Sequence, residues 1–395
     1  MSELASLPRV SVIVPAFNAG DDLERCLGAI GCLDTPVDEC IVVDDASTDE
    51  SVRAAADRHG ARALRMPRRS GPAAARNAGA AEARGDILLF VDADVLLHAD
   101  ALGRALDEFA RHPDAVAVFG SYDDAPEFPS FLSQYRNLYH HWNHQNGNAE
   151  ASTFWSGCGA IRREAFEAVG GFSADYETPS IEDVELGYRL RARGFRIRLI
   201  RDMQAKHLKR WTFASMVKTD LLLRAVPWVV LLRRFPDVPP DLNLNREARI
   251  AAMSSGLLAL SLLVLLPAHA AAIVPFLAML AVCLGCAAVA GRAPMARSRT
   301  ERGLVPAVLL LLGLPTAAWL ALPDSLAVVP ILLAALVAWT QRGFLRLLVK
   351  LRGPVFALGA VPPLLLFFLS CAVAVPLGVA WPGLAGRSAK ARPRG

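Results

Sequence analysis

The chain has 395 residues and a formal net charge of +4, which is divided unevenly along its length. Residues 1–250 contain 30 Lys and Arg against 36 Asp and Glu, whereas residues 251–395 contain 12 against 2. The resulting net charges, −6 and +10, predict a soluble first part long enough for a full α/β domain and an apolar, basic second part. Nucleic-acid binding explains the positive charge poorly, because the basic clusters flank apolar stretches and contain few aromatic residues. A membrane region with its positive flanks in the cytoplasm explains it better.

Cysteine usage and the N-terminus both favour a cytoplasmic first domain. The seven cysteines occur at irregular spacings, which predicts no disulfide framework and fits a reducing compartment. The first ten residues, MSELASLPRV, contain no apolar signal-peptide core. We therefore expect the first domain to lie in the cytoplasm.

Strand and helix patterns alternate over the first 120 residues. Strands are predicted at residues 10–14, 40–43, 62–66, 87–91 and 115–119. Helices are predicted from residue 21, over 51–59, from 72 to about 85, and over 99–111. This alternation implies βαβ units and a mainly parallel sheet, as in an α/β protein.

Residues 121–160 show no clear helix or strand pattern, and we expect them to be irregular. They are rich in aromatic and amide side chains and include His140, His141 and His144. The segment could form a lid facing an acceptor or a satellite core packed on the sheet, and both interpretations remain open. A zinc site on the histidines is disfavoured, because no carboxylate or cysteine stands at ligand spacing.

A helix and a strand are predicted again from residue 180. Ser180 is expected to cap a helix that Gly194 ends, and the alternating residues 195–199 predict a half-exposed strand. Residues 211–235 mix Trp, Leu and Arg and predict interfacial helices lying at lipid headgroups. The first domain would therefore cover residues 1–235.

The rest of the chain is predicted to be a linker over residues 236–250 and a transmembrane region over 251–395. Residues 251–290 are long enough for two spans, 304–339 for two more, and 355–381 for a last one broken at Pro362-Pro363. The basic segments 292–302 and 342–352 should lie in the cytoplasm. We expect four or five spans, and hence a multi-pass protein of the cell membrane.

Two pairs of carboxylates directly follow predicted strands. Asp44 and Asp45 come after residues 40–43, and Asp92 and Asp94 come after 87–91. Acids just beyond the carboxyl ends of parallel strands lie where open α/β sheets bind ligands. Asp92 and Asp94 can both turn toward one hard cation, which can hold a diphosphate. The pattern therefore indicates an enzyme that handles a nucleotide with a phosphate leaving group.

Several motifs together resemble a known family. The segments VSVIVPAFN, VVDDASTDES, GPAAARNAG, VDADV and SIEDVELGYRLRARGF occur in this order and spacing. They make residues 8–235 similar to a membrane-anchored bacterial family 2 glycosyltransferase with the Rossmann-like GT-A fold. The resemblance implies transfer of a sugar, with inversion, from a UDP- or GDP-sugar donor, with Mg²⁺ or Mn²⁺ as cofactor.

The resemblance also implies which residues bind the donor: Pro15, Ala16, Phe17, Asn18, Asp45, Arg76, Asn77 and Asp92. The first four would line the nucleotide base, and Asp45 would accept a hydrogen bond from the uracil imide. The stretch around Asp45 also has the residue types of a turn followed by a helix cap, which is the structural alternative to a contact with the nucleotide. Arg76 and Asn77 would lie near the nucleotide, although as helix-surface residues they need no such role.

The implied metal and catalytic residues come from three segments. Asp94 would ligate the cation, Asp92 would face the ribose or share the cation, and His207 would be a further ligand. Asp183 would act as the general base that takes the proton of the acceptor hydroxyl, with Glu182 beside it. Their place in the first turn of a helix favours the ionised form, although ordinary first-turn acids need no catalytic role.

Residues 207–211, HLKRW, resemble the Gln-x-x-Arg-Trp motif of processive polysaccharide synthases, with His207 in place of Gln. This departure puts processivity in doubt. Arg210 would screen the diphosphate. Trp211 would either stack on an acceptor or anchor the chain at the membrane interface.

Taken together, these patterns predict a membrane-bound inverting glycosyltransferase whose cytoplasmic active site faces a lipid or lipid-linked acceptor. One alternative is a processive polysaccharide synthase that extrudes its product through the membrane. Another is a catalytically inactive membrane scaffold that senses nucleotide-sugar. No nucleic-acid partner is expected.

Overall fold

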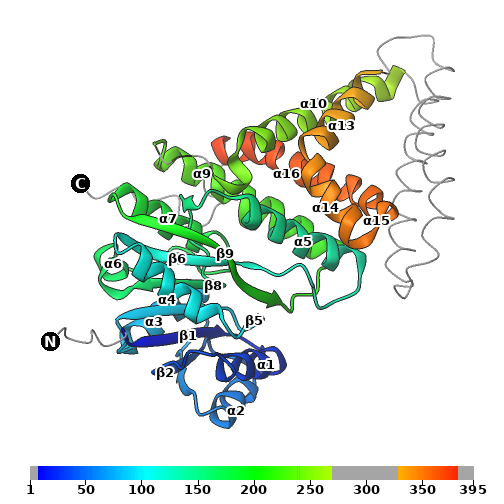
Figure 1. The fold of residues 1–395 in the computed structure, drawn as a ribbon. Helices are drawn as coiled ribbons and strands as arrows, with labels where there is room; N and C mark the ends of the chain where they lie inside the picture. Colours follow the sequence, from blue (N-terminus) through cyan, green and yellow to red (C-terminus); the bar gives the residue numbers. More distant parts are fainter. Residues whose placement is uncertain (1–7, 238, 240, 269–327, 381–395) are drawn as a thin grey trace.

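A mixed β-sheet forms the centre of the first domain in the computed structural model, which describes residues 8–237, 239, 241–268 and 328–380 (Figure 1). The strands are β1 (Val10–Ala16), β2 (Glu39–Asp44), β3 (Arg62–Arg65), β4 (Ile87–Val91), β5 (Val95–Leu97), β6 (Ala115–Tyr122), β7 (Glu150–Ala151), β8 (Cys158–Arg162) and β9 (Arg196–His207). They lie in the order β3-β2-β1-β4-β8-β6-β9-β5, with β7 paired to β9. Strands β3, β2, β1, β4, β6 and β9 all run in one direction, whereas β8 runs antiparallel between β4 and β6. The predicted α/β class with a mainly parallel sheet is confirmed.

Helices cover both faces of this sheet. They are α1 (Gly20–Gly31), α2 (Ser51–Arg58), α3 (Pro72–Glu82), α4 (Ala101–Arg111), α6 (Arg163–Ala168) and α7 (Glu182–Ala192). Leu23, Val52 and Phe109 place α1, α2 and α4 in one apolar core, and Phe166 and Leu186 place α6 and α7 in the core on the opposite face. All residues of β4 are buried, as predicted for an apolar run enclosed on both faces.

The elements predicted for the first 120 residues are all present, with ends within about three residues of the predicted ones. The strand predicted at 195–199 is longer and continues as β9 to His207, because its second half pairs with β5 and β6. Ile181, and not Ser180, occupies the cap position of α7.

The prediction that residues 121–160 are irregular is wrong for most of the segment, which forms α5 (Phe131–Asn146), β7 and the start of β8. Phe131, Tyr135 and Tyr139 of α5 pack with C-terminal helices in a third apolar core, so the satellite-core interpretation holds for them. Polar residues of α5 such as Asn137 are buried as well. Helix α5 therefore lacks the polar face that identifies an amphipathic helix in a sequence.

The C-terminal part of the described chain is helical, and its helices lie on one side of the sheet, next to α5 and α7 (Figure 1). Its elements are α8 (Phe213–Lys218), the π-helix η1 (Thr219–Ala225), α9 (Val226–Arg234), η2 (Leu242–Leu244), α10 (Arg246–Ala268), α13 (Val328–Thr340), α14 (Arg342–Arg352), α15 (Pro354–Gly359) and α16 (Val361–Ala380). The predicted basic segment 342–352 coincides with α14. The break expected at Pro362-Pro363 lies at Ala360, between α15 and α16.

Within the described ranges, one helical stretch, Pro354–Ala380, which comprises α15 and α16, is long and apolar enough to cross a membrane. The helices Val328–Thr340 and Arg342–Arg352 together are also long and apolar enough for a span, but a 70° bend separates them. A buried core helix can satisfy the same criterion, and 44% of the most apolar window of Pro354–Ala380 is buried within the structure. Much of the predicted four- or five-span region lies outside the described residues.

Candidate active site

A cavity of about 490 Å³ opens beyond the carboxyl ends of β1, β2 and β4. These ends meet because β1 lies between β2 and β4 and is parallel to both. Twelve of the fourteen site residues predicted from the sequence line the cavity: Pro15, Ala16, Phe17, Asn18, Asp45, Arg76, Asp92, Asp94, Glu182, Asp183, His207 and Trp211. The volume is in the range of small-molecule sites in proteins.

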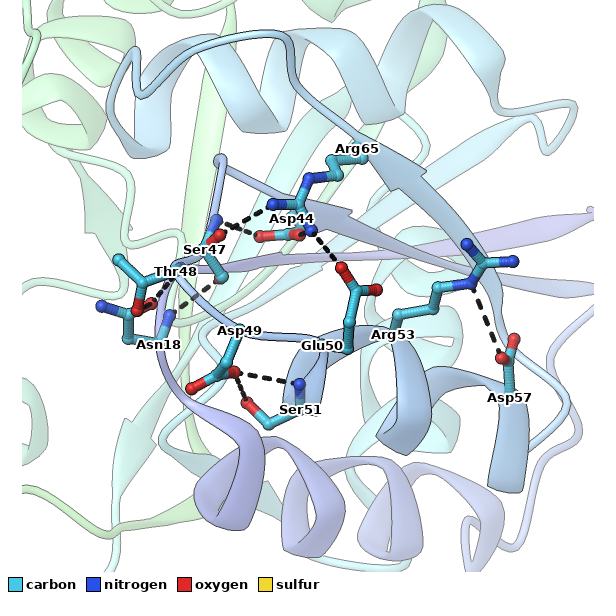
Figure 2. Close-up of polar contacts among 10 residues, drawn as sticks. All are labelled: Asn18, Asp44, Ser47, Thr48, Asp49, Glu50, Ser51, Arg53, Asp57 and Arg65. Carbon is cyan, nitrogen blue, oxygen red and sulfur yellow. Dashed lines mark hydrogen bonds and ion pairs between the residues drawn. The ribbon is translucent and has the colours of Figure 1, made fainter.

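The loops after β1 and β2 hold each other in place beside this cavity (Figure 2). Asn18 Oδ1 accepts a hydrogen bond from the Thr48 backbone N–H at 2.9 Å, and the Asn18 N–H donates to Ser47 Oγ at 3.0 Å. Asp44 Oδ1 accepts from the Ser47 N–H at 2.8 Å, and Arg65 lies 3.1 Å from Asp44 Oδ2. Asn18 has φ of 49°, a left-handed conformation that Asn tolerates better than most residues. The loop predicted to line the nucleotide base is therefore fixed by the protein itself.

Asp45 is a buried carboxylate that organises the start of α3. Its Oδ1 accepts from the Ser70 N–H at 2.7 Å and its Oδ2 from the Gly71 N–H at 2.8 Å. Gly71 has φ of 88°, and a Cβ there would lie 2.5 Å from the Glu177 carbonyl oxygen, so the loop requires glycine. Asp45 thus has a structural role, and its predicted contact with the nucleotide base stays a prediction.

Arg76 of α3 joins two acids that lie far apart in the sequence. Its Nη2 is 2.6 Å from Asp92 Oδ1, and its Nη1 is 3.0 Å from Glu182 Oε1. Burial disfavours the charged guanidinium, but these two carboxylates outweigh it and raise the pKa of Arg76 above its ordinary range. Asp92 therefore directs one carboxylate oxygen to Arg76, and its predicted contact with the ribose or the cation stays a prediction.

The other two predicted site residues lie outside the cavity. Asn77 donates through Nδ2 to the Phe172 carbonyl and accepts through Oδ1 from the Phe172 N–H, both at 2.8 Å. This pairing occupies its amide, which corrects the prediction that Asn77 approaches the nucleotide. Arg210 is exposed, and Lys209 and Arg224 line the cavity where Arg210 was expected.

Pairing of β5 with β9 brings Asp94 and His207 together. Val95 lies opposite His207 in the ladder, and Asp94 Oδ2 is 3.4 Å from His207 Nε2. The ring of Tyr122 stacks on His207, with the centroids 4.3 Å apart and an interplanar angle of 8°. Burial opposes ionisation of Asp94, but His207 and then Lys209 outweigh it and lower the pKa of the Asp94 carboxyl.

A carboxylate oxygen and an imidazole nitrogen that converge in this way are suitable ligands for one divalent cation such as Mn²⁺. No group of three His, Cys, Asp or Glu suited to holding a metal occurs in the described part of the chain. Asp94 and His207 would thus supply two ligands, and the other coordination positions would be open to oxygens of a bound ligand and water.

Asp183 lies in the first turn of α7 and lines the cavity. Its Oδ2 accepts from the Ser156 backbone N–H at 3.3 Å. Burial and then the charge of Glu182 raise the pKa of Asp183 to about 6, although Arg76 opposes the shift. Burial and the neighbouring carboxylate therefore oppose the expected effect of the helix start, and with a pKa of about 6 the carboxyl group is still mostly ionised at neutral pH. A carboxyl group with this pKa suits a general base near neutral pH.

The π-helix η1 supplies a cation that the sequence analysis did not identify. Arg224 lines the cavity and donates through Nη1 to His140 Nε2 at 2.9 Å. Burial, followed by the charge of Arg224, lowers the pKa of His140 well below its ordinary value, so its ring is neutral and can accept this bond. Ser180 Oγ donates to the Leu223 carbonyl at 2.7 Å and so ties η1 to the segment before α7. No sequence signal marks Arg224, since π-helices are short and follow no apolar period.

Trp211 lines the cavity but is only 3% exposed, which contradicts the interpretation as an interfacial anchor. Its backbone N–H donates to Ser133 Oγ at 2.9 Å, and its indole Nε1–H donates to Asn137 Oδ1 at 3.3 Å. Both partners belong to α5. Trp211 therefore fastens the end of the β9 segment to that helix.

The structure shares its fold with a solved glycosyltransferase. A mannosyltransferase from Pyrobaculum calidifontis, in complex with GDP-Man and Mn²⁺, matches it with a TM-score of 0.50 over 85% of this chain and 88% of that chain, at 24% identity. This likeness confirms the predicted GT-A fold, with the acid-lined cavity at the ends of its strands.

Two protein families match parts of the sequence. The family described as Glycosyl transferase family 2 matches residues 11–170, and N-terminal domain of galactosyltransferase matches residues 136–211. Residues 11–170 are therefore similar to glycosyltransferase family 2, and this match covers less than half of the chain.

Curated relatives match over part of their length. An uncharacterized glycosyltransferase of Haemophilus influenzae is 33% identical over 124 residues, which are 30% of this chain and 48% of the relative. Validoxylamine A glucosyltransferase of Streptomyces hygroscopicus is 28% identical over 272 residues, 60% of this chain and 63% of the relative. This chain thus spans less than two thirds of either relative.

Proposed function

We propose that this protein is a metal-dependent, inverting glycosyltransferase that transfers a sugar from a nucleoside-diphosphate sugar to a lipid or lipid-linked acceptor at the cytoplasmic face of the cell membrane. The observation that carries the proposal is a single cavity lined by Asp183, the Asp94–His207 pair and residues 15–18. The GDP-Man and Mn²⁺ bound by the related mannosyltransferase support a UDP- or GDP-sugar donor and a divalent cation.

In the proposed reaction, Asp183 takes the proton of the acceptor hydroxyl while the hydroxyl oxygen attacks the anomeric carbon. The bond from that carbon to the diphosphate oxygen breaks with inversion, and the nucleoside diphosphate leaves with the electron pair. Asp94 and His207 would hold Mg²⁺ or Mn²⁺, which when bound neutralises charge on the leaving diphosphate. Arg76 keeps Glu182 and Asp92 in place around the base.

Apolar surface on the C-terminal helices supports a lipid acceptor. Leu260, Leu263, Leu332 and Trp339 of α10 and α13 are 56%, 65%, 61% and 65% exposed. Clustered exposure of large apolar side chains is typical of membrane or protein contacts. The basic α14 and the apolar stretch Pro354–Ala380 would place such a surface at the bilayer. In this arrangement the cavity would lie within reach of a membrane lipid.

The decisive experiment measures nucleoside-diphosphate release by the purified, detergent-solubilised protein with a panel of UDP- and GDP-sugars. Each donor is tested with Mg²⁺, Mn²⁺ or EDTA, and with either a membrane-lipid extract or soluble sugar acceptors. Asp94→Asn should lower release at least tenfold, and Asp57→Asn, an exposed acid of α2, serves as the matched control.

Release that requires one donor, the cation and Asp94 would support the enzyme, and dependence on the lipid extract would support the acceptor class. Transfer to soluble sugars alone would rule out the lipid acceptor. A ladder of products would indicate a processive synthase. Donor binding without release under any condition would identify the nucleotide-sugar-sensing scaffold.

A further inference from the structure

One amide in α5 contacts both the predicted metal-ligating histidine and the tryptophan of the HLKRW segment. Asn137 Oδ1 lies 2.8 Å from His207 Nδ1 and 3.3 Å from Trp211 Nε1. Asn137 is 1% exposed, and His207 and Trp211 are also buried, so water does not compete for these contacts. The three residues form a closed polar cluster behind the Asp94–His207 pair.

The donor groups in this cluster fix which way the amide points. An indole N–H can only donate, so the amide atom that faces Trp211 must be the oxygen. In the opposite orientation the amide N–H₂ would face the indole N–H, and that hydrogen bond would be lost. In the observed orientation, Asn137 Nδ2 has no hydrogen-bond partner among the described residues. The orientation of the amide is therefore determined by the contact of its oxygen with Trp211.

The oriented amide in turn determines the hydrogen on His207. Because Asn137 Oδ1 is an acceptor, His207 Nδ1 must carry the hydrogen and donate it. In the neutral ring Nε2 then has the free lone pair that a metal ligand needs, and it lies 3.4 Å from Asp94 Oδ2. Two lone pairs that face each other at this distance repel, so a cation between them is favoured, either a proton or a bound metal ion. The stacked Tyr122 ring further restricts rotation of the imidazole.

We propose that Asn137, oriented by Trp211, is a positioning residue that holds His207 with its hydrogen on Nδ1 and thereby presents Nε2 to the divalent cation. This inference rests on the metal dependence in the proposed function. It assigns Trp211 a role behind the metal ligand, in addition to any contact with the acceptor. Partners of this kind orient metal-ligating histidines in many proteins, and their loss typically weakens metal binding about 10–100-fold.

The test is Mn²⁺ binding to the purified full-length protein, followed by electron paramagnetic resonance, alone and with UDP or GDP present. Asn137→Leu removes the acceptor and should weaken Mn²⁺ binding about 10–100-fold, whereas Asn137→Asp keeps an acceptor and should bind within a few-fold of wild type. His207→Ala gives the reference for loss of the ligand. Thermal unfolding midpoints show which variants fold.

The Trp211→Phe variant tests whether Asn137 acts through the orientation of its amide or only by stabilising the fold. Without the indole donor the amide can rotate, donate to His207 Nδ1 and move the ring hydrogen to Nε2, so Mn²⁺ binding should weaken. The double variant Trp211→Phe/Asn137→Asp should regain it, since a carboxylate has no donor end to present. This rescue carries the test even if Asn137→Leu does not fold.

Equal Mn²⁺ affinity in wild type and Asn137→Leu, with loss only in His207→Ala, would overturn the inference and leave the proposed function intact. Failure of the double variant to recover from the Trp211→Phe defect would overturn the amide-orientation step. No Mn²⁺ binding by wild type with either nucleotide would overturn both the inference and the metal dependence on which it rests.

Discussion

The two walls of the cavity are built in different ways. The first wall consists of the loops that follow β1, β2 and β4, with residues 15–18, Asp45 and Asp92. The second wall consists of His140 of α5, the segment after β9 and Arg224 of η1. Groups on the first wall lie within a few residues of a strand end. Those on the second wall are joined by side-chain contacts between segments 70 or more positions apart.

This difference suggests that the two walls bind different parts of the substrates. Strand ends give the first wall a rigid geometry, which suits the constant part of a donor, its nucleotide. The second wall depends on packing between α5, η1 and the C-terminal helices, which suits the acceptor and the diphosphate. The first turn of α7 lies where the walls meet, since Glu182 contacts Arg76 and Ser180 contacts η1.

The largest effect is expected at this junction, from Asp183→Asn. Removal of a general base typically lowers the rate about 10²–10⁴-fold, and the substitution keeps the shape of the side chain. Donor binding should be retained, because the first wall is unchanged. Single-turnover transfer rates and calorimetric donor titrations measure the two quantities separately.

The matched control for this variant is Asp107→Asn, which removes an exposed acid of α4 that does not line the cavity and should leave the rate unchanged. If Asp183→Asn instead weakened donor binding and left the rate of bound substrate intact, Asp183 would belong to the donor wall and not to the chemistry.

Arg76→Met should produce the next largest effect, on stability. Arg76 is 3% exposed, and its loss leaves Glu182 and Asp92 without their cation. Removal of one partner of a buried ion pair typically lowers the free energy of unfolding by about 3–5 kcal/mol. Thermal or urea unfolding of the purified protein measures this loss, and Arg58→Met, at an exposed pair with Glu24, should leave the midpoint close to that of wild type.

The second wall contains a comparable buried pair, Arg136 with Asp220, in which Arg136 also lies beside the Trp211 ring. Arg136→Met should destabilise the protein for the same reason. A much smaller loss than for Arg76→Met would show that the second wall is held less tightly than the first. Losses of stability of equal size in the two variants would mean that the two walls are held equally tightly.

The pH dependence of kcat/KM should reflect the raised pKa of Asp183, with a change of about tenfold per pH unit on the acidic side. The base must be ionised to accept a proton, and the pKa of Asp183 is raised to about 6, so kcat/KM should fall as pH drops through about 6. Glu182→Gln removes a neighbouring negative charge that raises this pKa, so the acidic limb should move to lower pH. An unchanged limb in Glu182→Gln would mean that another group controls it.

The contrast between the walls also explains how much the sequence predicted. The first wall was predictable because short apolar runs identified β1, β2 and β4, and the polar residues after them had to share one sheet edge. Helix α5 was missed because Gln134 and Asn137 are buried along with its aromatic residues, which leaves no polar face. Its aromatic spacing at Phe131, Tyr135 and Tyr139 was the available signal.

Two arginines show where motif matching ends: Arg210, predicted to screen the diphosphate, and Arg224, which lines the cavity. Arg210 matches a motif position, but whether its side chain reaches the cavity depends on how the chain leaves β9. Arg224 reaches the cavity because η1 packs against α16 and Ser180, which are contacts between distant segments. Such tertiary contacts are not encoded in any local period of the sequence.

The smallest predicted effect distinguishes these two arginines. Arg224→Gln should lower kcat/KM about tenfold, equivalent to about 1.4 kcal/mol, because a cavity-lining cation that can meet the leaving diphosphate is lost. Arg210→Gln removes the same charge from an exposed position outside the cavity and should stay within about twofold of wild type. Both rates come from nucleoside-diphosphate release at low donor concentration. The reverse order would mean that the HLKRW segment rearranges when donor binds, and that Arg210, as the motif predicts, is the residue that meets the diphosphate.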